Sequence, residues 1–198
     1  ILHRLVGSEM CIRDSLLPDA LAKQLRQLDN PPLALRVRLG DEVALGQALG
    51  VIADRKKPAR ERIELIRAAG DVDLIRLKAK LLGLVQSESD AGVVTAALLF
   101  LQRIDDPALG QAVAGRLADL PAAARSTAIS FLASRAKWSG QLLDAVESGR
   151  LAKRDIAATI VEVLLGHGNK VADRTKAAWA SAGQPAGIGT AAEIARVR

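Results

Sequence analysis

The sequence predicts an all-α fold, an α-solenoid in which short helix pairs stack on one another. Alanine and leucine, both strong helix formers, dominate the 198 residues. Long alternations of Val, Ile and Thr, which are typical of strands, are missing. Helix starts recur about 32 residues apart from Pro58 onward, and a helix pair of this length buries its apolar face only against neighbouring pairs. At 49% apolar and 25% charged residues, the composition is that of a globular chain.

The stretch from 89 to 104 is the most apolar part of the sequence. Ser89 and Asp90 are suited to cap the N-terminus of a helix. The apolar side chains that follow lie on nearly every side of that helix: Val93, Val94, Ala96, Ala97, Leu98, Leu99, Phe100 and Leu101. The stretch is too short to cross a bilayer, which takes ~20 apolar residues. We therefore expect other helices to cover it on more than one side.

Two helices are expected near the start of the chain. The first runs over 17–28, and the sequence Asp-Asn-Pro-Pro at 29–32 breaks it. The second is short and covers 33–39. Gly40 follows it, and glycine is a common residue just after the end of a helix.

A third helix is expected after Asp41, which is placed to cap it. Its apolar face consists of Leu45, Ala48, Leu49 and Ile52. Residues 54–57 are expected to form a charged turn, and Pro58 suits the first turn of the helix after it because the missing N–H of proline is not needed there.

From this point the pattern becomes periodic, with a helix, a turn and a second helix in each unit. The expected helix starts are Pro58, Asp90, Pro121 and Lys153. The expected turns are Gly70-Asp71, Asp105-Asp106-Pro107, Lys137-Trp138-Ser139 and Gly168-Asn169. The expected apolar faces of the second helices are Leu74, Leu77 and Leu81; Leu109, Val113 and Leu117; Leu142, Leu143 and Val146; and Val171 and Ala177.

These helix pairs resemble degenerate HEAT repeats, with short helices and Asp near the turn inside each pair. The Trp/Gly/Tyr pattern of tetratricopeptide repeats and the Thr-Pro-Leu-His turn of ankyrin repeats are missing. The alternative is a non-repetitive helical bundle in which the spacing is accidental.

The two ends of the sequence differ from this pattern. Residues 5–15, LVGSEMCIRDS, are similar to a translated transposase adapter used in sequencing libraries, and they hold the only Met and the only Cys of the chain. We therefore expect 1–15 to be a non-native segment and 16–182 to be the solenoid. Residues 183–198 are expected to be a Gly/Pro linker, GQPAGIG, and the truncated start of a further helix whose Thr190 and Glu193 have capping-box spacing.

Two stretches together carry a resemblance to a known family. They are 33–54, which contains an Arg-Leu-Gly-Asp turn, and 132–182, which contains W..LLDAVE.G.L and a His-Gly-Asn turn before a helix ending in Trp. They resemble the helical-repeat segment of large exported proteins of planctomycetes and verrucomicrobia. In that family a β-propeller similar to sugar dehydrogenases precedes the repeats, and a c-type cytochrome domain follows them. The resemblance implies a periplasmic location and neighbouring redox domains. It implies no catalytic residue, because the haem signature Cys-x-x-Cys-His is missing from this chain.

A basic cluster is the main candidate for ligand contact. Under a nucleic-acid-binding interpretation, the residues that would contact phosphate are Lys56, Lys57, Arg60, Arg62, Lys78 and Lys80, with Arg76 near them. Acidic residues are interleaved with them, and no aromatic side chain is close in sequence for base stacking. We therefore favour a solvated face of mixed charge.

Single residues give little further indication of chemistry. Trp138 and Trp179 are expected in the core, with an interface anchor as the alternative for each. His167 has no second His or Cys with which to share a metal, apart from residues in 1–15, and it is expected at a helix C-terminus. We predict no catalytic, cofactor-binding or metal-ligating residue, no cofactor and no membrane span.

Three classes of function follow. The favoured one is a non-catalytic helical-repeat scaffold or protein-interaction segment of a larger exported redox protein. Its partners would be other domains of the same polypeptide or separate proteins. The second is a HEAT-like module that binds nucleic acid through the basic cluster. The third is an enzyme on a HEAT-like scaffold, which ranks last because no convergent set of polar residues is found in the sequence.

Overall fold

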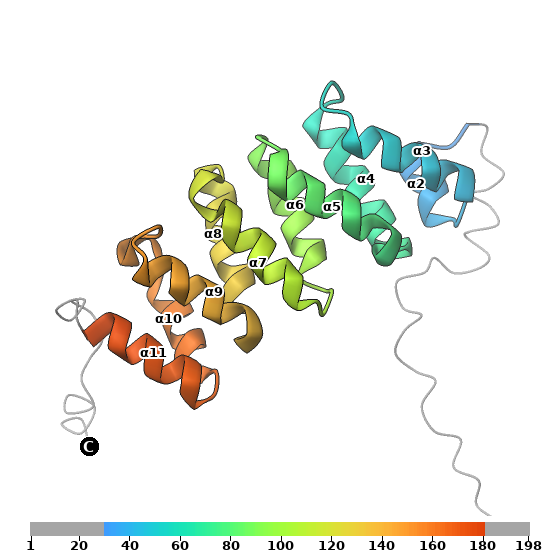
Figure 1. The fold of residues 1–198 in the computed structure, drawn as a ribbon. Coiled ribbons are helices and arrows are strands. Elements are labelled where there is room, and N and C mark those ends of the chain that lie inside the picture. The colour runs from blue at the N-terminus through green and yellow to red at the C-terminus, as the bar shows by residue number, and fades with distance from the viewer. Residues whose placement is uncertain (1–29, 181–198) are drawn as a thin grey trace, which may run out of the picture. The chain divides into compact units, whose positions relative to one another are not determined.

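The computed structural model describes residues 30–180, and this part of the chain is helical throughout (Figure 1). It contains ten α-helices and two short 3₁₀ helices, and no strand occurs between residues 30 and 180. The prediction of an all-α protein is therefore confirmed. The expected helix at 17–28, the segment 1–15 and the tail 183–198 lie outside the described residues.

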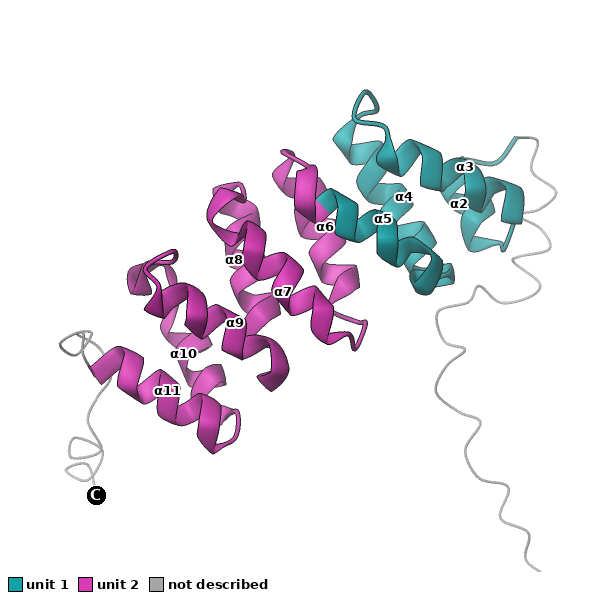
Figure 2. Ribbon diagram, in the orientation of Figure 1, with its two compact units in different colours: residues 1–84 teal, residues 85–198 magenta. Residues whose placement is uncertain are grey.

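The chain divides into two compact units between Leu84 and Val85 (Figure 2). The helices of the first unit are α2 (Leu33–Arg38), α3 (Glu42–Ala53), α4 (Ala59–Val72) and α5 (Leu74–Ser87), which runs past the boundary. Those of the second unit are α6 (Ala91–Leu101), α7 (Pro107–Arg116), η1 (Leu117–Asp119), α8 (Ala122–Ala133), α9 (Ala136–Glu147), η2 (Lys153–Asp155), α10 (Ala158–Gly166) and α11 (Asn169–Ala180).

In the first unit, α2, α3 and α4 pack against one another. The turn from α2 to α3 is made by Gly40, whose φ of 80° is a conformation that glycine adopts at little cost. The N–H groups of Gly40 and Asp41 donate to the carbonyls of Val37 and Arg36, at 2.9 and 3.1 Å. These two bonds satisfy carbonyls that the end of α2 would otherwise leave open. The predicted helix end at Gly40 is confirmed.

Asp41 caps α3 as predicted, and its carboxylate accepts a hydrogen bond of 2.9 Å from the N–H of Ala44. The same carboxylate forms an ion pair of 2.7 Å with Arg36. The hydrogen bond from Ala44, and then that from Arg36, hold the pKa of Asp41 below its usual value of 3.8. Because the folded pKa is the lower one, the carboxylate stabilises the fold above pH 3.8, and this contribution is lost as the pH falls further.

The Asp41 cap gives a pH prediction. Asp41→Asn keeps a capping oxygen but cannot ionise, so we expect the variant to be less stable than wild type at pH 7. The two proteins should converge as the pH falls below 3.8, where the wild-type carboxylate takes up its proton. Urea unfolding of both proteins at several pH values measures the difference. A gap that stays constant down to the lowest pH would contradict the assignment.

In the second unit, the helices form two rows in which alternate helices contact each other. One row is α6, α8 and α10, and the other is α7, α9 and α11. The rows are joined where α8 meets α7 and α9, and where α10 meets α11 (Figure 1). The side chains fully buried in this unit include Leu98, Leu101, Leu109, Leu120, Phe131, Leu132, Trp138 and Leu142.

Helix α6 lies where the most apolar stretch of the sequence predicts it. Asp90 is its N-cap, and the carboxylate accepts a hydrogen bond of 2.9 Å from the N–H of Val93. Six of its side chains are buried: Val93, Val94, Ala96, Ala97, Leu98 and Leu101. One apolar side chain of this helix faces solvent, since Leu99 is 53% exposed.

Two of the predicted turns are wrong. Gly70 and Asp71 lie inside α4, and the chain breaks instead at Asp73, whose carboxylate accepts a hydrogen bond of 2.9 Å from the N–H of Arg76. The predicted turn at 137–139 lies inside α9, and the real turn is Ser134-Arg135. In the second case the polar residues beside Trp138 favour a turn, but the burial of Trp138 stabilises the helical conformation instead.

Two further expectations need correction. Lys153 begins a 3₁₀ turn, and α10 starts only at Ala158, because Leu151 and Ile156 on either side of the turn are both buried. Ala177 does not belong to the apolar face of α11, since it is exposed. That helix buries Ala172 and Thr175 instead, and the hydroxyl of Thr175 donates to the carbonyl of Val171 at 2.8 Å.

The centre of the second unit is an aromatic stack. The rings of Phe131 and Trp138 lie 4.4 Å apart and within 8° of parallel. The indole N–H of Trp138 donates to the carbonyl of Asp106 at 3.0 Å, which satisfies its polar atom in the core. A Cβ on Gly110 would lie 2.5 Å from the indole, so α7 approaches α9 closely at this residue.

This close approach predicts opposite effects for two glycines of α7. Alanine is favoured over glycine in a helix by about 1 kcal/mol, and overpacking a core costs about 1–3 kcal/mol. Gly110→Ala should therefore destabilise the protein by about 1–2 kcal/mol, because the clash with Trp138 outweighs the helix propensity. Gly115→Ala is the matched control, since a Cβ there meets no atom within 4 Å, and it should be neutral or stabilising. Chemical denaturation measures both, and equal effects would contradict this packing.

Candidate functional site

The basic cluster does not form a single surface in the first unit. Arg62 is only 2% exposed, and its Nε donates to the carbonyl of Ile52 in the last turn of α3 at 3.0 Å. A guanidinium in this position stabilises the C-terminus of α3, where carbonyl groups and the helix dipole attract positive charge. It is not available to contact phosphate, and its assignment to that role is wrong.

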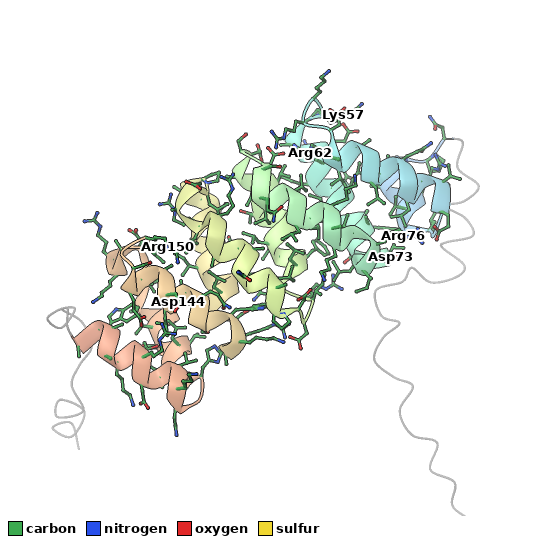
Figure 3. The ribbon with its side chains drawn as sticks, viewed as in Figure 1. Lys57, Arg62, Asp73, Arg76, Asp144 and Arg150 are labelled. Carbon is green, nitrogen blue, oxygen red and sulfur yellow. The ribbon has the colours of Figure 1, made fainter. Side chains whose placement is uncertain are left out.

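Arg76 lies at the other end of α3. It forms ion pairs of 2.7 Å with Glu42 and 3.2 Å with Asp73, and both carboxylates raise its pKa, the hydrogen bond to Glu42 being the first cause. Glu42, the partner of Arg76, begins α3, whereas Lys56 and Lys57 follow its end (Figure 3). At 1.5 Å per residue, the length of α3 therefore separates Glu42 from the two lysines by about 17 Å.

The remaining cations of the cluster lie in three places along the chain. Lys56 and Lys57 are exposed in the turn between α3 and α4, and Arg60 is exposed in the first turn of α4. Lys78 is half-buried and Lys80 exposed on α5. The turn and the start of α4 therefore present several exposed cations, which can attract a polyanion but do not enclose one.

A second group of polar contacts joins successive repeats in the second unit, and sequence reasoning missed it. A guanidinium nitrogen of Arg135 donates to the carbonyl of Gln102, just after α6, at 2.9 Å. Nε2 of His167 lies 2.6 Å from the carbonyl of Ala133, the last residue of α8. In both cases a residue in the connection between the two helices of a pair satisfies the helix end of the preceding repeat. The feature of the sequence that could have indicated these contacts is the spacing of Arg135 and His167, which is close to the period of the helix starts.

Charged pairs support the same junctions from the surface. Asp105 forms an ion pair with Lys137 and another with Arg135 at 3.2 Å, and the hydrogen bond from Lys137 is the main reason that its pKa is lowered. Further along, Arg174 of α11 lies 2.7 Å from both Asp144 and Glu147 of α9. These contacts are exposed, so each is worth little alone, but together they fix which surfaces of the two helices meet.

A hollow in the surface of this unit lies between α7 and α9 and has a volume of about 440 Å³. Figure 3 labels two of its lining residues, Asp144 and Arg150. The others are Gln111, Ala114, Gly115 and Gln141. The lining thus holds one carboxylate, one guanidinium and two amides, with no His, Cys or hydroxyl group. It offers hydrogen-bonding groups without a nucleophile and base.

The two tryptophans have different environments. Trp138 is fully buried, so it belongs to the core and the alternative of an interface anchor is wrong for it. Trp179 is half-buried near the end of α11. His167 is the C-terminal cap residue of α10, at the helix end where it is predicted.

Within residues 30–180, no group of three or more His, Cys, Asp or Glu side chains is placed to hold a metal ion. Among the same residues, no helix has the length and apolar character that a membrane span requires. Comparison with models of protein families, with curated proteins and with solved structures finds no match to this chain.

Proposed function

We propose that the chain is a non-catalytic helical-repeat scaffold, a segment of a short α-solenoid that holds other domains or partner proteins in place. The observation that carries this proposal is the contact pattern of the second unit, in which α6, α8 and α10 form one row and α7, α9 and α11 the other. Such two-row stacking of helix pairs is the arrangement of α-solenoids.

The contacts between repeats support the proposal. Arg135 and His167 make equivalent bonds to the ends of α6 and α8, so the same junction occurs twice. A packed stack of this kind bends little, whereas the end-to-end distance of a flexible linker fluctuates widely. It can therefore hold two attached domains at a nearly fixed separation.

The resemblance of 33–54 and 132–182 to repeats of exported dehydrogenase–cytochrome proteins suggests which domains these are. On this proposal the scaffold lies in the periplasm, between an oxidising β-propeller and a c-type cytochrome. The scaffold performs no redox step itself and sets the distance between the two.

The genomic locus tests this placement directly. We expect the reading frame to continue beyond the codon for Arg198 and to encode Cys-x-x-Cys-His downstream. A stop codon soon after Arg198, with no haem-binding signature following, would overturn the placement in a redox protein. The scaffold proposal would then stand for a freestanding repeat protein.

The alternative function is nucleic-acid binding, which the exposed Lys56, Lys57 and Arg60 favour. Because Arg62 is buried and Arg76 is paired, we expect only weak binding. The protein should leave a duplex-DNA column below about 150 mM salt, since few phosphates are neutralised. The triple variant Lys56→Ala, Lys57→Ala, Arg60→Ala should elute at almost the same position. Retention to high salt that the triple variant abolishes would favour the alternative instead.

A further inference from the structure

The hollow between α7 and α9 is open space bordered by polar groups. Its volume of about 440 Å³ lies within the range of about 300–1,000 Å³ found for pockets that bind small ligands. Ala114 and Gly115, which line it from α7, have no side chain long enough to fill it. A Cβ added at Gly115 would meet no atom within 4 Å. A short stretch of polypeptide can therefore enter this space.

The turn that ends α9 holds Arg150 at the edge of the hollow. Gly149 has a φ of 73°, which glycine adopts at little cost. The N–H of the buried Leu151 donates to the carbonyl of Ala145 at 3.0 Å, so the backbone is fixed on both sides of Arg150. Its Nε donates to the hydroxyl of Ser148 at 3.0 Å, and within residues 30–180 no acceptor is bonded to its two terminal nitrogens. A guanidinium with these nitrogens open can bind a carboxylate through paired hydrogen bonds.

The two glutamines of the lining offer the groups that a peptide backbone needs. The amide nitrogen of Gln141 donates to the carbonyls of Lys137 and Trp138 in its own helix, at 3.0 and 2.8 Å, which leaves its amide oxygen to accept a hydrogen bond from a ligand. Gln111 is exposed on α7, and its amide can both donate and accept. A peptide group carries one donor and one acceptor, so the two amides complement it.

The charges of the lining match a single carboxylate better than a polyanion. Asp144 forms an ion pair of 2.7 Å with Arg174, which offsets the repulsion that an unpaired carboxylate would exert on an anion. Among the described residues that line the hollow, Arg150 is the one cation (Figure 3). One guanidinium between amides suits one acidic side chain flanked by peptide groups.

We propose that this hollow binds an extended segment of a partner protein. An acidic side chain of the segment pairs with the guanidinium of Arg150, and its peptide groups bond to Gln111 and Gln141. The inference rests on the proposed scaffold function and deepens it, since it names the chemistry by which a partner is held. Because α7 and α9 belong to successive helix pairs, the segment lies across the junction between two repeats.

Titration of the full chain followed by nuclear magnetic resonance tests the proposal with two blocked peptides, acetyl-Ala-Glu-Ala-amide and its neutral match acetyl-Ala-Gln-Ala-amide. We expect saturable shifts of the side-chain amides of Gln111 and Gln141. The neutral peptide should bind at least about tenfold more weakly, because a hydrogen bond to a charged group contributes about this factor. Equal affinities, or no saturable shift, would overturn the proposal. Inorganic phosphate that binds as tightly as the acidic peptide would show a simple anion site and would overturn it too.

Variants locate the binding in the hollow. Arg150→Gln should weaken binding of the acidic peptide by at least about tenfold. Gly115→Leu should abolish it, because the new side chain occupies the hollow while its Cβ meets no atom of the protein. The matched control is Arg154→Gln, since this arginine is exposed four residues further on and does not line the hollow. An Arg150→Gln variant that binds the peptide as well as this control does would contradict the assignment.

The backbone amides of α8 and α9 report separately on the scaffold. They should be protected from hydrogen exchange in the free protein, whether or not the peptide binds. Protected amides without peptide binding would contradict this site alone. Rapid exchange throughout both helices would contradict the stacking, and so the proposed scaffold itself.

Discussion

Replacing Trp138 by alanine is expected to reduce the free energy of unfolding by about 4 kcal/mol, as for other fully buried aromatic residues. The indole is completely buried, stacks on Phe131 and donates to the carbonyl of Asp106. The substitution leaves a cavity between α7 and α9 and removes the indole donor to that carbonyl. Small movements of neighbouring side chains neither fill this cavity nor replace the hydrogen bond. Urea unfolding followed by circular dichroism measures the change.

Trp179→Ala is the matched control for this prediction, since it removes the same side chain from a half-buried position on α11. We expect it to cost less than about 2 kcal/mol, because part of that surface is already in water. Fluorescence should agree, with the emission of Trp138 at shorter wavelength than that of Trp179. Equal destabilisation by the two substitutions would show that Trp138 is not at the centre of the unit.

Arg62→Ala should destabilise the protein by about 2–3 kcal/mol, because the substitution removes a buried side chain and a hydrogen bond. The carbonyl of Ile52 at the end of α3 then has no donor from this guanidinium. Arg60→Ala, two residues earlier and exposed, should stay within about 0.5 kcal/mol of wild type. Thermal or urea unfolding of both variants gives the comparison.

The comparison of Arg62→Ala with Arg60→Ala also tests whether Arg62 contacts phosphate. If Arg62 were a surface residue that contacts phosphate, its removal would leave stability unchanged and weaken binding to DNA. We expect the reverse for Arg62→Ala, with a large effect on stability and almost none on retention by DNA.

Local signals predict much of the fold correctly. The caps Asp41 and Asp90 and the turn at Gly40 each depend on residues within one or two helical turns, and all three lie where the sequence places them. The helix starts are also regular, because α4, α6 and α8 each begin one residue after Pro58, Asp90 and Pro121. These features need no knowledge of distant contacts.

The errors occur where contacts distant in sequence decide the structure. Gly70 has the residue type of a helix end, yet it is buried within the last turn of α4, which continues to Val72. The Lys and Ser that flank Trp138 predict a turn, whereas the contacts of Trp138 with Phe131 and Asp106 place it inside α9. The residue type at one position does not indicate which distant residues it will contact.

The same reason explains why the polar contacts between helices are not predicted. Arg62 is buried because its guanidinium reaches the end of another helix, and Arg135 and His167 each bond to a carbonyl more than thirty residues away. A charged residue that caps a neighbouring helix cannot be distinguished by composition from one on a solvated face. Its recurrence with the repeat period is the feature that can be searched for in a sequence.

The most direct test of the scaffold is a distance measurement within the second unit. Spin labels at Gln111 of α7 and Lys176 of α11, both exposed positions of one row, would be introduced in a Cys11→Ser background so that no other thiol is present. Double electron–electron resonance should give a single narrow distance distribution that is unchanged by moderate salt, because the contacts of Arg135, His167 and Arg174 hold successive helix pairs together. A broad distribution, or two separate distances, would contradict a rigid stack and with it the proposal that this chain holds other domains at a fixed separation.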